Sequence, residues 1–162
     1  MAKRILLTFL LIMAGCSSQQ PEKLPPYQLV FNIAPNVNDS APLKIDVMLL
    51  KSKEEFMSAD FFSLQGNAKA ALSDKLVNED RFFILPTEHV RHLLEQNQPE
   101  IHYIGIVAEY RQLDGKKWRI ALPVPIPEKP PFYKFWRSAP NKLQVCIKVT
   151  GSGLSPDLTC AA

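Results

Sequence analysis

Alternation of apolar and polar residues in three stretches limits the fold of this chain more than any other feature. Every second residue is apolar in residues 27–34, 43–50 and 143–149, with polar side chains at most positions between them. Because successive side chains of a β-strand point to opposite faces, this pattern predicts strands with one face turned toward a core. The sequence therefore predicts a sheet protein whose strands occur near both ends of the chain.

A β-hairpin is predicted in the second half of the chain. Residues 101–110 are apolar at both parities, which is typical of a central strand covered on both faces. Asp114-Gly115 is a strong tight-turn signal, so residues 101–112 and 117–124 should pair as neighbouring strands. Residues 123–131 are rich in proline, which favours an exposed polyproline stretch over a central strand.

Helix signals are confined to residues 53–95. Ser52 and Glu55 have the spacing of a capping box, in which the hydroxyl accepts from the amide of Glu55. Gly66-Asn67 should break the helix that follows, and residues 68–77 should resume it.

Residues 80–95 mix strand and helix signals. Residues 80–85 are strand-like, whereas Thr87 could cap a short helix bearing Val90, Leu93 and Leu94. At least six strands, with helices that do not alternate regularly with them, argue against a doubly wound fold. They predict a mainly β protein, a two-sheet β-sandwich with a helical insertion between strands.

The first residues have the form of an export signal. Lys3 and Arg4 precede an apolar run that is too short to span a bilayer, which needs about 20 residues. The run ends in Met13-Ala14-Gly15-Cys16, which resembles a bacterial lipobox, where the cysteine sulfur receives a diacylglyceryl group before cleavage. This resemblance implies that Cys16 is the lipid-bearing first residue of the mature protein.

The predicted anchor divides the chain into three parts. Residues 1–15 are a signal peptide, residues 16–26 a lipidated polar tether able to reach roughly 30 Å, and residues 27–162 a periplasmic domain. Lipoproteins retained in the inner membrane typically carry aspartate where this chain has Ser17. The resemblance therefore implies attachment to the outer membrane, with the domain facing the periplasm.

The predicted mature chain carries almost no net charge. Loss of Lys3 and Arg4 with the signal leaves 17 basic and 16 acidic side chains. No dense basic run is present, so nucleic acid is not predicted as a partner.

Cys146 and Cys160 remain in the predicted mature chain. The periplasm is oxidising, so a disulfide between them is the favoured interpretation, with two free thiols as the alternative. Closing a loop of roughly 15 residues would contribute about 3 kcal/mol in the chain-entropy treatment. Cys146 has the parity opposite to the apolar residues of its strand, so the bond would hold the C-terminal tail across the outer face of the sheet.

The sequence offers no catalytic constellation. His89 and His92 are three residues apart beside Glu88, but a third metal ligand would have to come from His102 or a distant carboxylate. Exposed histidines on a helix explain them more simply. Gly151-Ser152-Gly153 lacks the spacing of a nucleophile elbow and is interpreted as a flexible link into the last segment. We expect no enzyme activity, metal or cofactor.

Several short segments occur in a recognisable order along the chain. They are the lipobox ending at Cys16, Val30-Phe31-Asn32-Ile33, residues 43–51, residues 56–64, Pro86-Thr87-Glu88, residues 104–111 and Trp118-Arg119. In this order they resemble the TssJ family, the outer-membrane lipoproteins of the type VI secretion membrane complex. The likeness spans nearly the whole mature chain. Met13, residues 123–131 and the cysteine pair depart from the family pattern.

The resemblance implies a transthyretin-like β-sandwich that holds the periplasmic C-terminal domain of the inner-membrane protein TssM, in a complex that also contains TssL. The partner-binding loop of the family falls on Pro35, Asn36, Val37, Asn38, Asp39, Ser40, Ala41 and Pro42. Val37 has no obvious place in a core, so it is expected to be an apolar anchor for the partner. Another class stays open, a periplasmic sandwich that binds a small ligand or hydrolyses a substrate in a deep polar pocket.

Overall fold

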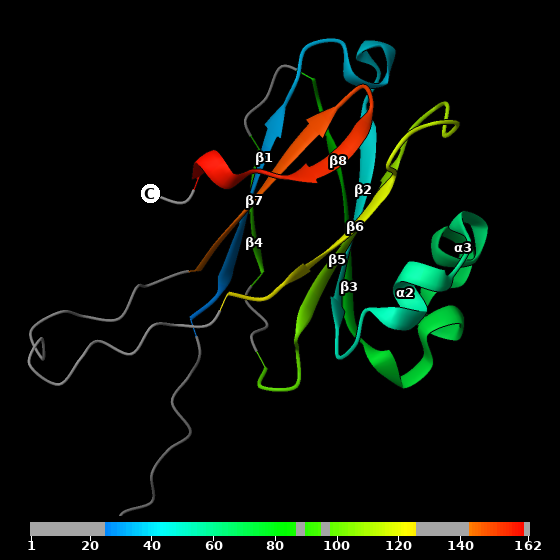
Figure 1. Cartoon of the computed structure of the whole chain (residues 1–162), viewed down its shortest axis with the longest axis vertical. Helices are drawn as coiled ribbons and strands as arrows, with labels where there is room; N and C mark the ends of the chain where they lie inside the picture. The colour runs from blue at the N-terminus through cyan, green and yellow to red at the C-terminus, as the bar shows by residue number, and fades with distance from the viewer. Residues whose placement is uncertain (1–24, 87–89, 95–97, 126–142, 161–162) are drawn as a thin grey trace, which may run out of the picture.

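The computed structural model describes residues 25–86, 90–94, 98–125 and 143–160, and the structural statements below refer to them. The strands in these residues are β1 (Tyr27–Ile33), β2 (Leu43–Leu50), β3 (Leu76–Ile84), β4 (Val90–Leu94), β5 (Tyr103–Glu109), β6 (Arg119–Pro123), β7 (Leu143–Thr150) and β8 (Gly153–Pro156). They form two four-stranded sheets packed face to face (Figure 1). This confirms the predicted two-sheet β-sandwich.

The strand order brings β1 and β7, from opposite halves of the chain, side by side. One sheet has the order β4-β1-β7-β8 and the other has the order β3-β2-β5-β6. β1 lies inside the first sheet, where it pairs in parallel with β7 and antiparallel with β4. β5 pairs antiparallel with β6, which confirms the predicted hairpin. The alternating residues of β1, β2 and β7 meet between the sheets, where Phe31, Ile45 and Ile147 are fully buried.

Two helices cover the outer face of the second sheet (Figure 1). They are α2 (Glu54–Ser58) and α3 (Phe61–Leu72). Phe56 of α2 and Leu64 of α3 pack against Met48 of β2 and Val107 of β5. This contact explains why β2 and β5 carry buried apolar residues on both of their faces. The predicted break is confirmed as a kink, because Asn67 has the non-helical angles φ −155° and ψ 71°.

Each helix begins in its own way. The Asp60 carboxylate accepts the Ser63 N–H at 3.0 Å and so caps α3. The capping box predicted at α2 is wrong in its detail, because the Ser52 hydroxyl donates to the Glu55 carboxylate at 2.7 Å. Lys53 is the N-cap residue of α2, and no side chain caps it.

The second sheet has a buried carboxylate on the face that the helices cover. Asp46 of β2 is fully buried, and the Nε atom of Arg81 donates to it at 2.8 Å. Burial raises the pKa of Asp46, whereas the nearby charges of Lys44 and Arg81 act to lower it. Lys44 also pairs with Glu109 at 2.5 Å, and Gln65 of α3 donates to Glu109 at 2.8 Å. The network therefore ties α3 to β2, β3 and β5.

Residues 90–94 form an edge strand, so the short helix predicted after Thr87 is wrong. They pair antiparallel with β1, from Val90 opposite Phe31 to Leu94 opposite Tyr27. Leu94 is buried in the core, and the imidazole of His92 stacks on Phe82 with ring centroids 4.2 Å apart. A five-residue helix would be marginal alone, whereas the edge of β1 offers ladder hydrogen bonds, so tertiary pairing overrides the helical spacing.

Residues 150–153 form a tight hairpin turn, which corrects the predicted flexible link. Thr150 of β7 pairs with Gly153 of β8. Gly153 has φ +124°, and a Cβ atom there would lie 2.5 Å from the backbone N and O of Lys117. The Lys117 N–H donates to the Ser152 carbonyl at 3.0 Å, and the Leu154 N–H donates to the Lys117 carbonyl at 2.8 Å. The glycine at position 153 therefore lets the β7–β8 turn contact the segment that leads into β6.

Replacing Gly153 by alanine should lower the free energy of unfolding by about 1–3 kcal/mol, since a positive φ and a backbone clash coincide. Urea unfolding followed by circular dichroism would measure the loss. Gly151→Ala is the matched control, because a Cβ atom at Gly151 meets nothing within 4 Å. Equal stabilities of the two variants would contradict this close approach.

Several predicted features fall partly or wholly outside the described residues. Cys146 is disulfide-bonded, and its carbonyl accepts the Asp157 N–H at 2.9 Å, which places the tail beside β7. The side chain of Cys160 is not among those described, so its pairing with Cys146 stays a prediction. Pro123 ends the edge strand β6, while most of the proline-rich stretch, the signal, Cys16 and most of the tether lie outside the described ranges.

Candidate functional site

The predicted partner-binding loop, residues 35–42, lies at one end of the sandwich. The chain enters β1 at Tyr27 at the other end (Figure 1). The loop joins β1 to β2, two strands that each have a neighbour on both sides. Pro35, Asn36, Asp39, Ser40 and Pro42 are exposed, and Ala41 is partly buried. Both ends of the loop are therefore held by the body of the two sheets.

Four residues of the loop have a left-handed backbone. Asn36, Asn38, Asp39 and Ser40 have φ values of +59°, +55°, +54° and +61°. This conformation costs about 1–2 kcal/mol for an ordinary residue, although asparagine and aspartate tolerate it better than most. Three such residues in succession wind the chain opposite to an ordinary helical turn. Strain of this kind persists only where the surroundings fix it, and it concentrates at functional sites.

Val37 and Asn38 fix this loop from its buried side. Val37 is 1% exposed and packs in the core between the sheets. It is therefore not available to a partner, and its prediction as an apolar anchor is wrong. Asn38 is also buried; its Nδ2 donates to the Pro42 carbonyl at 3.0 Å, and its Oδ1 accepts the Arg111 N–H at 2.8 Å. One side chain thus closes the loop and joins it to the β5–β6 hairpin.

Two further connections lie at the same end of the molecule (Figure 1). They are the tip of the β5–β6 hairpin, residues 110–118, and the β7–β8 turn, residues 150–153. The Tyr110 hydroxyl donates to the Thr150 carbonyl at 3.1 Å, and burial raises the pKa of Tyr110, which keeps this donor protonated. The Lys116 ammonium lies 5.0 Å from the centroid of the Tyr110 ring and donates to the Gly151 carbonyl at 2.9 Å.

We call the surface formed by residues 35–42, 110–118 and 150–153 the distal surface. The Arg111 N–H donates to Asn38 and the Lys117 N–H donates to Ser152, so the three connections form one body. Only loop 35–42 was predicted from the sequence as a binding surface; the part played by the other two connections was missed. The Asp114-Gly115 turn signal was visible, but it did not show which other loops would lie beside the hairpin.

The histidines considered as metal ligands have other contacts. His92 Nε2 lies 2.5 Å from an oxygen of the Asp80 carboxylate, and His102 Nδ1 lies 3.0 Å from the Lys51 carbonyl oxygen. His89 lies outside the described residues. Within the described ranges, no group of three histidine, cysteine, aspartate or glutamate side chains is arranged to hold a metal.

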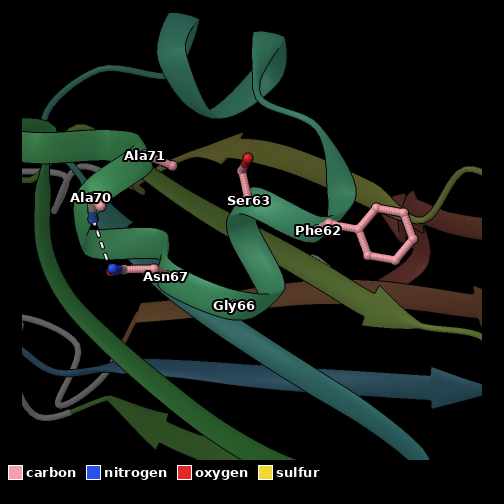
Figure 2. Close-up of a pocket in the computed structure, with 6 residues that line it drawn as sticks. All are labelled: Phe62, Ser63, Gly66, Asn67, Ala70 and Ala71. Atoms are coloured by element: carbon pink, nitrogen blue, oxygen red, sulfur yellow. Dashed lines mark hydrogen bonds between the residues drawn. The ribbon is translucent and has the colours of Figure 1, made fainter.

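A hollow on the outside of α3 bears on the ligand-binding alternative. It is lined by Phe62, Ser63, Gly66, Asn67, Ala70 and Ala71 (Figure 2). Asn67 already accepts the Ala70 N–H through its side chain at 3.1 Å, and the Ser63 hydroxyl donates to Asp60 at 2.5 Å. None of the lining residues is charged, and the polar groups of Ser63 and Asn67 already form hydrogen bonds within the helix and its cap. The hollow lies on the outer side of α3, whereas this alternative requires a deep polar pocket.

The family described as "Type VI secretion lipoprotein, VasD, EvfM, TssJ, VC_A0113" matches residues 26–151. The chain belongs to the TssJ family. The match includes β1, loop 35–42 and the whole β5–β6 hairpin, and it ends within the β7–β8 turn. TssJ proteins are lipoproteins of the type VI secretion apparatus, and this chain is one of them. No curated protein sequence matches the chain.

Two solved structures of type VI secretion components have the same fold. The chain is 43% identical to Serratia marcescens Lip, a membrane-bound component of the type VI secretion system, over 82% of this chain and 96% of that one, with a TM-score of 0.70. It is 27% identical to the lipoprotein TssJ1 from Pseudomonas aeruginosa, over 81% and 93% of the two chains, with a TM-score of 0.66.

A third match comes from a structure that concerns TssM. A chain in the structure of the TssM C-terminal domain from EAEC is 18% identical, over 83% of this chain and 98% of that one, with a TM-score of 0.61. This match shows the fold alone.

In the part of this TssJ chain that the structure describes, no helix is long and apolar enough to cross a membrane.

Proposed function

We propose that this TssJ protein is a non-catalytic tether, attached to the outer membrane through lipid on Cys16, which docks the periplasmic C-terminal domain of TssM through loop 35–42. The membrane complex would also contain TssL, as the family resemblance implies. The TssM structure among the matches supports this choice of partner.

The observation that carries the proposal is the preorganised left-handed loop at the end of the molecule away from the predicted anchor. Asn36, Asp39 and Ser40 are exposed on it, while Val37 and Asn38 hold it from within. A loop ordered before binding loses little conformational entropy when a partner docks. The strained backbone is thus better explained by presentation of polar groups than by packing alone.

The path of β1 suits a tether under load. Its seven residues span about 23 Å and lead directly from the predicted tether to loop 35–42. The strand pairs with β4 on one side and with β7 on the other. Tension between the anchor and the docked partner would therefore run along one already extended strand that is held on both sides. The helices and the second sheet need not lie in that path.

Replacing Asp39 by lysine should weaken binding of the TssM periplasmic domain about tenfold or more, because an exposed acid at the centre of the proposed interface becomes a base. Binding would be measured by calorimetry with the purified domain 27–162. Asp74→Lys is the matched control, since Asp74 is an exposed acid in η2 (Ser73–Lys75), beyond the end of α3. Undiminished binding by Asp39→Lys and by a bulky Ser40→Arg variant would remove the loop from the docking site.

A further inference from the structure

The distal surface extends beyond the loop to which the proposed function assigns docking. The backbone nitrogen of Arg111 lies 2.8 Å from the Oδ1 atom of Asn38. The hairpin therefore contacts loop 35–42 two residues after the end of β5. Lys117, at the other side of the hairpin tip, is held by the β7–β8 turn through its backbone N–H and carbonyl. A partner that rests on loop 35–42 therefore meets the hairpin tip without any movement of the protein.

The two parts of this surface carry opposite charges. Loop 35–42 has one charged residue, Asp39, and it is exposed. The hairpin tip has three basic residues, Arg111, Lys116 and Lys117, against the single acid Asp114. Arg111 and Lys117 are exposed, whereas Lys116 is partly buried against Tyr110. A single exposed acid thus lies beside a basic edge, and hydrogen bonds join the two parts.

We propose that the tip of the β5–β6 hairpin is the second half of the docking surface, and that Arg111 and Lys117 bind an acidic segment of the docked protein. This inference rests on the proposed function, because it takes the partner of loop 35–42 to be the TssM periplasmic domain. Complementary charges on a polar interface set orientation and speed association more than they add raw affinity. The hairpin would therefore steer the approaching partner and fix the angle at which it is held.

Asn38 is the positioning residue of this arrangement. Its two side-chain hydrogen bonds hold the loop and the hairpin in one relative position, and the side chain that makes them is itself buried. The backbone bonds of Lys117 with Ser152 and Leu154 do the same on the other side of the hairpin. Charge changes at the side chains of Arg111 and Lys117 leave all of these backbone bonds in place.

The test is the affinity and association rate of Arg111→Glu, Lys117→Glu and the double variant for the purified TssM periplasmic domain. We expect each single reversal to weaken binding about tenfold, mainly through slower association, and the double variant to lose most of the salt dependence of the wild type. Arg111→Lys should retain binding. Lys69→Glu makes the same charge change on the exposed side of α3 and should bind as the wild type does. Thermal unfolding of every variant checks that the fold is kept.

The outcomes separate this inference from the proposed function. If both hairpin reversals bind with unchanged rates while Asp39→Lys loses binding, the hairpin is not part of the surface and the inference is overturned. If Asp39→Lys and the hairpin reversals all bind like the wild type, the proposed function is lost with it. Slower association of the hairpin variants, with Lys69→Glu unaffected, supports the basic edge as the site for an acidic segment.

Discussion

Asn38→Ala should lower the free energy of unfolding by about 2–4 kcal/mol and leave loop 35–42 without its fixed shape. The substitution removes the acceptor of the Arg111 N–H and the donor to the Pro42 carbonyl, two bonds that the buried Asn38 side chain makes. Each lost hydrogen bond of this kind costs about 0.5–1.5 kcal/mol. Alanine also tolerates the left-handed backbone of residue 38, φ +55°, less well than asparagine does. Urea unfolding of the domain measures the loss.

Asn36→Ala provides the matched control for Asn38→Ala. Asn36 has nearly the same backbone, φ +59°, but it is exposed and its side chain makes no capping bond. Its replacement should cost about 1 kcal/mol, which is the backbone contribution alone. The difference between the two variants then measures the two hydrogen bonds of Asn38. Equal losses would mean that these bonds do not hold the loop.

The affinity for the TssM domain should depend on how well loop 35–42 is ordered before binding. Asn38→Ala removes no exposed group of the distal surface, so any loss of affinity would come from the loop becoming mobile before binding. The same variant should speed hydrogen exchange at the Arg111 amide, because that N–H loses its acceptor. Unchanged affinity with faster exchange would show that docking does not need a rigid loop.

Alternation predicted the strands that carry the fold, because one face of each is buried. β1, β2 and β7 have the expected inward residues, and the Asp114-Gly115 turn lies in the β5–β6 hairpin. β4 was mistaken for a helix because its apolar residues Val90, Leu93 and Leu94 have helical spacing, and its five residues are too few for strand periodicity to emerge. The parallel pairing of β1 with β7 could not be read from local pattern, since it joins residues more than a hundred positions apart.

The resemblance to the TssJ family indicated the position of loop 35–42. The internal structure of the loop could not be predicted, because it depends on contacts with residues far away in the sequence. Val37 lies in a polar run of sequence, and its burial depends on how the loop folds over the open end of the sandwich. The bond from Asn38 to Arg111 likewise joins residues 73 positions apart. The same limit applies to Gly153, whose glycine was taken for flexibility until the approach of Lys117 gave it a steric reason. Contacts made by a single residue leave no periodic trace in a sequence.

Replacing Cys16 by serine should abolish incorporation of labelled palmitate, because the sulfur that would carry the diacylglyceryl group is gone. Each buried CH₂ group contributes roughly 0.8 kcal/mol to membrane binding, so removal of the acyl chains removes the proposed anchor. A second variant, with residues 1–16 exchanged for an ordinary cleavable signal, should appear in the soluble periplasmic fraction. Cys160→Ser is the control for loss of a thiol and should keep both the label and the membrane association. Membrane association of the exchanged-signal variant, in cells that lack TssM, would mean that another part of the chain binds lipid. In that case the load path along β1 from the anchor to the distal surface would have to be abandoned.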